Sequence, residues 1–242
     1  MSQYDDEYSL IFRVTGRPDV VFMMADDRSA DTGYGVRRIN PGRPLVFENA
    51  FPDKFIKGNF PEFIANIMFD GTSRIIVNEQ IKTYLENFDI NGLQIYPAIY
   101  KDIHGKFHEN YWFLNFYLHL DCWDRTNSEV YEDEKENEDE DYEDEYEDEY
   151  EDEGDEEEDD DDDVDDAWVD EIKPAIKKFS LDAKVLDNIP EEHRLLIRMD
   201  GLNRGYIFLH KRIVRFLERI KATGYRTIPI PKYVGGMENY DE

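Results

Sequence analysis

The sequence predicts an α+β fold with a mixed or antiparallel sheet, a repeated strand–helix–strand unit and a long acidic loop insertion. Three observations lead to this fold class. Two segments share the same strand–helix–strand pattern, one stretch is dense in aromatic and aliphatic residues, and one run consists almost entirely of carboxylates. The first two observations indicate a folded chain of short strands and helices. The carboxylate run is an insertion in that folded chain.

The repeated unit becomes visible when the sequence is shifted by 132 positions without a gap. Residues 73–98 then lie over residues 205–230, and Gly92 meets Gly224. In the first copy a short strand is followed by Asn78, which can cap a helix whose apolar residues recur at helical spacing. A glycine after each helix suits a backbone position with positive φ. The alternative, that any two strand–helix–strand units look alike, remains open.

Local patterns predict further elements. Tyr111–Leu120 is dense in aromatic and aliphatic residues, which indicates a central strand covered on both faces. Pro61 opens a short apolar stretch, so a short helix is expected over Phe60–Met68. Ala25–Arg43 is rich in Asp, Gly, Ser and Pro and is expected to be a long loop.

The acidic run covers residues 129–166. It holds 29 carboxylates and one lysine, so its net charge is −28, whereas the whole chain carries −30. The other 204 residues are therefore nearly neutral and numerous enough to bury a sizeable core. Direct nucleic-acid binding is not expected, because phosphates are repelled by a chain this acidic. A polyanion of this kind is usually directed at a strongly basic partner.

Several features bear on the compartment. No apolar run reaches the roughly 18 residues that a membrane-spanning helix needs. The acidic amino-terminal stretch lacks the basic region of a signal peptide. A single cysteine, Cys122, excludes an intrachain disulfide. We therefore expect a cytoplasmic protein without membrane association.

Three tyrosines of the acidic run, Tyr142, Tyr146 and Tyr150, recur at a spacing of four. One interpretation is a solvated, disordered linker, because like charges and aspartate disfavour a helix there. Another is a segment that wraps around a basic partner, in which tyrosines add apolar area and cation–π contacts. Nonspecific binding of divalent cations is a third. The residues expected to bind the partner are Tyr142, Glu143, Asp144, Glu145, Tyr146, Glu147, Asp148, Glu149, Tyr150, Asp159, Asp160 and Asp161.

A polar motif, DCWDR, stands directly before the acidic run. Asp121 and Asp124 could be paired catalytic carboxylates or metal ligands, but no third ligand is apparent. We favour the interpretation in which both cap the turn after the strand and Arg125 pairs with one of them. His104 and His108 belong to a glycine-containing hairpin turn, where a zinc site is not expected. Because no established catalytic or phosphate-binding motif occurs, we predict no enzymatic activity, metal or cofactor.

Three segments, GLQIYPA, NYWFLNFYLHLDCWDRTNS and LLIRMDGLNRGYIFLHKRIVRFLERIKATGYRTIPI, together resemble the immunity protein family eleven of bacterial polymorphic toxin systems. The similarity covers roughly Phe60–Ser128 and Ser180–Ile230, and the acidic run is not part of the family pattern. The resemblance implies a small cytoplasmic antidote that binds a cognate toxin. Its hallmark positions are Asn115, Asp121, Asp124 and Ser128, then Arg198, Gly201 and Gly224, and we add Arg125 and Gly92 as structural motif residues.

The sequence therefore predicts an N-terminal half over 1–128, an acidic insertion over 129–166 and a C-terminal half over 167–242, with the two halves in one compact domain. The leading hypothesis is an immunity protein that neutralises a toxin with a basic cleft, such as a nuclease, and uses the acidic run as a polyanion mimic. The alternative is an acidic chaperone or binding protein for basic partners.

Overall fold

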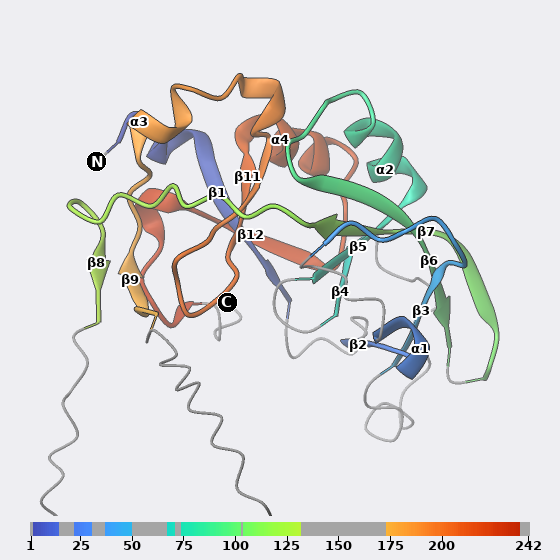
Figure 1. Cartoon of the computed structure of the whole chain (residues 1–242). Helices are drawn as coiled ribbons and strands as arrows, with labels where there is room; N and C mark the ends of the chain where they lie inside the picture. Colours follow the sequence, from blue (N-terminus) through green and yellow to red (C-terminus); the bar gives the residue numbers. More distant parts are fainter. Residues whose placement is uncertain are drawn as a thin grey trace, which may run out of the picture. The chain divides into compact units, whose positions relative to one another are not determined.

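The computed structural model describes residues 2–14, 22–30, 37–49, 67–70, 74–102, 104–131 and 173–237 (Figure 1). Internal contacts divide the chain into two units, one formed by Met1–Tyr131 with Lys173–Glu242 and the other by Glu132–Ile172. The second unit, which holds most of the acidic run, lies outside the described residues. The elements that follow all belong to the first unit.

One sheet contains four antiparallel strands. In order across the sheet they are β10 (Leu196–Arg198), β11 (Ile207–His210), β1 (Tyr8–Arg13) and β12 (Tyr225–Pro229). Because successive side chains of a strand point to opposite faces, Leu10 enters one buried cluster and Ile11 enters another. Both faces of this sheet are therefore covered.

Six further strands close into a small barrel. In order around it they are β2 (Phe22–Ala25), β3 (Leu45–Asn49), β6 (Leu93–Lys101), β7 (Phe107–Phe116), β5 (Arg74–Asn78) and β4 (Ile67–Asp70). Most neighbours are antiparallel, and only β3–β6 and β2–β4 are parallel among these described strands. β7 pairs with both β5 and β6, so it is the central strand that the aromatic stretch indicated, although it begins and ends about four residues earlier than expected.

The remaining elements are short. The helices are α1 (Asp27–Ala30), α2 (Glu79–Leu85), α3 (Ala183–Leu186) and α4 (Lys211–Arg219), with 3₁₀ turns η1 (Asp5–Glu7), η3 (Glu191–His193) and η4 (Ile230–Lys232). A two-stranded ribbon of β8 (Glu129–Val130) and β9 (Ile176–Lys178) stands apart from both sheets. The fold class is therefore α+β with mostly antiparallel sheets, as the sequence predicted.

Two strand–helix–strand segments have the same arrangement. β5 and β6 are connected through α2, and both pair antiparallel with β7, which lies between them. β11 and β12 are connected through α4, and both pair antiparallel with β1 in the same way. The rings of Tyr84 on α2 and Phe216 on α4 stack with centroids 3.7 Å apart, and these two positions differ by 132. An internal duplication remains a prediction that would account for this shared topology.

A single apolar cluster connects the barrel with the four-stranded sheet. Ile81 and Leu85 of α2 belong to it together with Ile213 and Leu217 of α4. Figure 1 shows α2 and α4 next to each other above the two sheets, which agrees with the ring stack between them. The two similar segments therefore bury their helices against one another.

Two sequence expectations need correction. The helix expected over Phe60–Met68 does not extend to its end, because Ile67 and Met68 belong to strand β4, while residues 60–66 lie outside the described part. Ile67 and Phe69 are both buried, which is strand alternation and not helical spacing. The loop expected over Ala25–Arg43 contains the short helix α1, whose Ser29 N–H bonds to the Asp26 carboxylate.

We predict that Gly92→Ala destabilises the protein more than Gly105→Ala. Both glycines have positive φ, +71° and +76°, which costs an alanine about 1–2 kcal/mol. Only at Gly92 would the added Cβ also lie 2.5 Å from Leu118 Cβ, whereas nothing lies within 4 Å at Gly105. Urea unfolding of the two variants measures the difference. Equal losses would show that the contact with Leu118 relaxes without penalty.

Candidate functional site

The DCWDR motif belongs to a segment that leaves β7 and crosses the carboxyl-terminal part of the chain. Leu120 forms a parallel bridge with Met199, and Trp123 forms an antiparallel bridge with Leu181. The Asp124 N–H donates to the Ser180 carbonyl at 2.8 Å. These backbone bonds hold the segment against the core directly before the acidic run begins.

Asp121 and Arg125 form a bidentate ion pair, with N–O distances of 3.1 and 2.7 Å. The Arg125 guanidinium also lies over the Trp123 ring, 4.5 Å from its centroid. Gly201, at φ +75°, allows this close approach, because a Cβ there would lie 3.1 Å from Trp123 Nε1 and 3.3 Å from Arg125 Nη2. The Asp121 carboxylate is thus bound by the Arg125 guanidinium in a structural ion pair.

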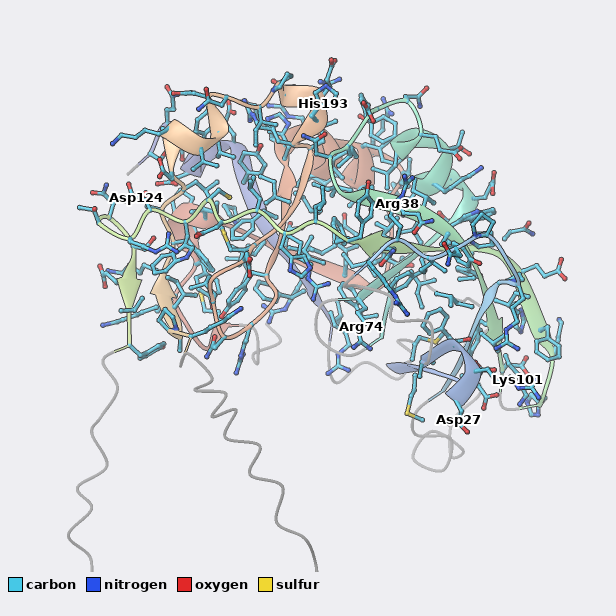
Figure 2. All side chains as sticks on the ribbon, in the orientation of Figure 1. Asp27, Arg38, Arg74, Lys101, Asp124 and His193 are labelled. Carbon is cyan, nitrogen blue, oxygen red and sulfur yellow. The ribbon has the colours of Figure 1, made fainter. Side chains whose placement is uncertain are left out.

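Asp124 caps the turn that follows (Figure 2). Its Oδ1 accepts from the backbone N–H groups of Thr126 and Asn127, and its Oδ2 accepts from the Asn127 side-chain amide. The Asn127 amide, with the two backbone donors, holds the pKa of the Asp124 carboxyl below its usual range. Both carboxylates were expected to cap this turn, but only Asp124 is seen to do so, while Asp121 pairs with Arg125. The two carboxylates therefore have separate partners.

The other motif positions also make structural contacts. The buried Asn115 amide donates to the Arg37 carbonyl and to Gln94 Oε1, both at 3.0 Å. The Ser128 hydroxyl bonds to both the carbonyl and the N–H of Ser180. Gly224 follows α4 at φ +91°, the conformation that its place after a helix predicted.

The β8–β9 ribbon forms the stem of the acidic segment. Glu129 lies opposite Lys178 in the ribbon, and the two side chains form an ion pair at 2.6 Å. The Tyr131 N–H donates to the Ala175 carbonyl at 2.9 Å. Both ends of the segment 132–172 are therefore held together by paired backbone.

The residues expected to bind the partner lie outside the described part of the chain. These are Tyr142, Glu143, Asp144, Glu145, Tyr146, Glu147, Asp148, Glu149, Tyr150, Asp159, Asp160 and Asp161. Their role therefore remains a prediction from the sequence.

Cys122 and His108 both have structural surroundings. Cys122 is fully buried, and burial raises the pKa of its thiol to about 12, so it is not a nucleophile at neutral pH. His108 Nε2 lies 2.8 Å from Asp102 Oδ2, and its ring stacks on Tyr100. Across the described residues, no group of three or more His, Cys, Asp or Glu side chains could hold a metal ion.

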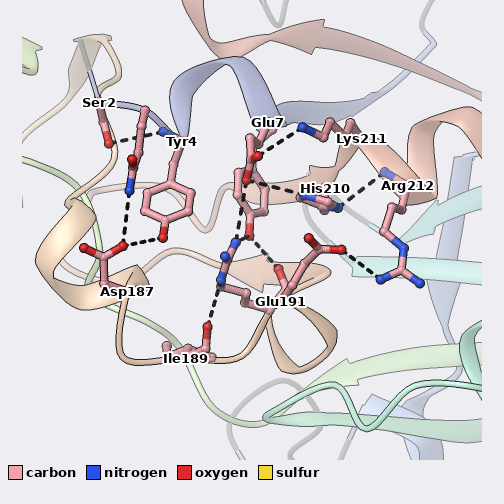
Figure 3. Close-up of polar contacts among 12 residues, drawn as sticks. Ser2, Tyr4, Glu7, Asp187, Ile189, Glu191, His210, Lys211 and Arg212 are labelled. Atoms are coloured by element: carbon pink, nitrogen blue, oxygen red, sulfur yellow. Dashed lines mark hydrogen bonds and ion pairs between the residues drawn. The ribbon is translucent and has the colours of Figure 1, made fainter.

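A buried polar cluster at the start of α4 was not anticipated from the sequence (Figure 3). His210 is fully buried, and its Nδ1 accepts from the Arg212 N–H at 3.4 Å. Its Nε2 lies 3.7 Å from the nearer Glu7 oxygen, which is too long for a hydrogen bond. Arg194 donates to the Tyr8 hydroxyl at 2.8 Å, and the Tyr8 hydroxyl donates to the Arg194 carbonyl at 3.0 Å. The cluster connects the first strand with α4. Its partners are far apart in the sequence, 186 residues for Tyr8 and Arg194, so local patterns could not predict it.

Burial lowers the pKa of His210, and the nearby carboxylates of Glu191 and Glu7 offset this only in part. His210 is therefore neutral in the folded protein at neutral pH. Because an unfolded histidine titrates near 6.5, acidification below that pH favours the unfolded chain.

We predict that Asp124→Ala lowers the free energy of unfolding by about 1 kcal/mol at pH 7, the net value of a lost hydrogen-bond acceptor. The folded pKa is depressed, so this contribution is present above the unfolded pKa of about 3.9 and is lost as the pH falls through the folded value. Urea unfolding at pH 7 and near pH 2.5 measures the change. Thr126→Ala, in the same turn, keeps the backbone donor and serves as the control; an equal loss there would contradict the capping role.

We predict that the protein loses stability as the pH falls from 7 through 6.5 toward the lowered folded pKa of His210, because in that window the unfolded chain binds the proton more readily than the folded chain. His210→Asn keeps a side-chain acceptor for the cap but should flatten the pH dependence, although the variant is less stable at pH 7. His104→Gln, in the exposed hairpin, is the control and should retain the slope. An unchanged slope in His210→Asn would rule out this linkage.

No helix among the described residues is long and apolar enough to cross a membrane. Comparison with curated proteins gives no match. Residues 45–151 match the family model described as Immunity protein family (Imm11). The match begins before the first segment of the expected similarity and extends into the acidic run, whereas Ser180–Ile230 lies outside it. Over residues 45–151 the chain is thus similar to the Imm11 immunity protein family, the family that its sequence motifs indicated.

Proposed function

We infer that the protein neutralises a cognate toxin by binding it, and that the acidic segment occupies a basic cleft of that toxin in place of a polyanionic substrate. An immunity protein has a toxin as its partner, and the family match supports that class of function. The observation that selects the mode of binding is the charge of the segment, −28 over residues 129–166 in an otherwise nearly neutral chain. A nuclease is the favoured target class, because its nucleic-acid cleft is basic, and an enzyme that uses a nucleotide cofactor is next.

The folded part of the chain supports a binding function without catalysis. The two carboxylates of the motif have structural partners, Asp121 with Arg125 and Asp124 with its turn. The thiol of Cys122 is buried and protonated. What remains for recognition is the charged segment, whose ends the β8–β9 stem holds in place.

The physical effect of such a segment is mainly on the rate of association. A large negative charge attracts a basic cleft and raises the association rate by about 10- to 1,000-fold, and the effect falls with ionic strength. Self-repulsion among the carboxylates is relieved when a cationic surface neutralises them. Tyrosines within the segment would add apolar contact area and cation–π contacts.

We predict that replacing residues 132–172 by a short Asn-Gly turn, which the antiparallel stem can close, lowers the association rate for the toxin encoded by the neighbouring gene by at least about tenfold at low salt. Protection of cells from that toxin should fall in parallel. Surface plasmon resonance at several salt concentrations, with a catalytically inactive toxin, gives the rate. Unchanged affinity and protection would contradict the mimic and leave the immunity function standing.

Two controls separate charge from sequence. A full-length variant with Asn and Gln in place of the Asp and Glu residues of 132–172 keeps the length and the tyrosines but removes the charge, so it should behave like the deletion. A second variant, with Ser at Tyr142, Tyr146 and Tyr150, keeps the charge and should dissociate faster. If the parent binds unrelated basic proteins as tightly as the toxin, the chain is an acidic chaperone instead.

A further inference from the structure

Exposed apolar residues gather at the stem of the acidic segment. Val130, Tyr131 and Val234 have exposed fractions of 39%, 47% and 44%. Tyr131 lies against Gly235, since a Cβ at Gly235 would be 2.6 Å from the Tyr131 hydroxyl oxygen and 2.7 Å from its ring. Val234 directly precedes Gly235 in the chain, and Val130 directly precedes Tyr131. We call these four residues the stem surface: Val130, Tyr131, Val234 and Gly235.

The stem surface is fixed by backbone bonds and by the core. The Gly235 N–H donates to the Lys177 carbonyl at 2.8 Å, so the carboxyl-terminal segment is bonded to β9. Val130 lies opposite Ile176, which is buried, and Tyr233 next to Val234 is buried as well. A surface held in this way loses little conformational freedom when a partner binds it, which favours affinity.

Charges around the stem surface are paired locally. Lys178 forms an ion pair with Glu129 at 2.6 Å, and Lys173 forms one with Asp200 at 3.6 Å. The hydrogen bond from Lys178, with the nearby charge of Lys177, lowers the pKa of Glu129. The stem surface is therefore apolar with two ion pairs near it, and in the sequence it directly adjoins a segment of high negative charge.

We propose that the stem surface is the folded part of the toxin-binding interface and contacts an apolar patch beside the basic cleft of the toxin. This rests on the proposed function. The segment 132–172 leaves the ribbon after Tyr131 and returns at Lys173, so a toxin held by the segment is held near the stem. A second contact between partners that are already joined gains from their raised effective concentration. Tyrosine is among the residues most enriched at the energetic anchors of interfaces.

The test uses the full chain with single substitutions Tyr131→Ser and Val234→Ser. Phe107→Ser is the matched control, because Phe107 is 57% exposed on the β6–β7 hairpin, away from the ribbon. Two probes are used, the inactive toxin of the neighbouring gene and polylysine, which offers charge without an apolar patch. We expect Tyr131→Ser to raise the Kd for the toxin about tenfold, the effect of a lost anchor residue. The change should appear in the dissociation rate, persist at high salt and leave polylysine binding unchanged.

The outcomes distinguish this inference from the proposed function. If the stem variants bind the toxin like the parent, or if Phe107→Ser weakens binding as much, the stem surface is not an anchor and the inference is overturned. If the stem variants bind tenfold more weakly while deletion of 132–172 has no effect, the stem contact stands and the polyanion mimic is overturned. A thermal unfolding midpoint equal to that of the parent is required of each variant. If Tyr131→Ser fails this requirement, Val234→Ser carries the test, and parent-like binding by that variant overturns the inference.

Discussion

One apolar cluster lies between the barrel and the four-stranded sheet. Each of these layers buries an apolar face in this cluster. α2 and α4 lie over this junction and stack Tyr84 on Phe216. A sheet with one open apolar face is unstable in water, so each half of the chain depends on the other for its core. The central strands β1 and β7 have corresponding places in the two sheets. Each pairs on both sides with the strands of one strand–helix–strand segment, and the helix of that segment packs into the cluster.

The polar groups near the acidic segment serve this architecture. Asp121 and Arg125 position the Trp123 ring, and Ser128 ties the crossing segment to Ser180. Asp121, Arg125 and Ser128 each form a hydrogen bond with a neighbour within the folded unit. The charge that would attract a partner is carried elsewhere, in residues that contribute no described contact to the core. The described polar groups of this motif therefore serve the stability of the fold.

Much of this fold follows from local sequence patterns. Alternating apolar residues and the glycines after two helices indicated β5–α2–β6 and β11–α4–β12, because strand and helix periods are set within a few residues. The ring stack between Tyr84 and Phe216 could not be predicted, since spacing does not determine how two helices pack. β4 was missed because its apolar run is short and adjoins a proline-containing stretch, where strand and helix patterns are alike.

The candidate site was only partly predictable for a related reason. The turn formed by Asp124 has partners within three residues, so the motif alone suggested it. The stem and the His210 cluster join residues that are far apart in sequence, such as Tyr131 with Gly235 and Glu7 with His210. Contacts of that range leave no periodic signal in one sequence. The acidic run itself was evident from composition, which reports charge and not geometry.

The paired stem also bears on how such a chain can diversify. The entropic cost of closing a loop rises slowly with its length. Each doubling of the number of residues between the two held ends adds only about 0.6 kcal/mol to that cost. Changes of length between Tyr131 and Lys173 therefore add little closure cost as long as the stem stays paired. The chain can thus vary in charge and length at this one place while the two strands of the stem keep their register.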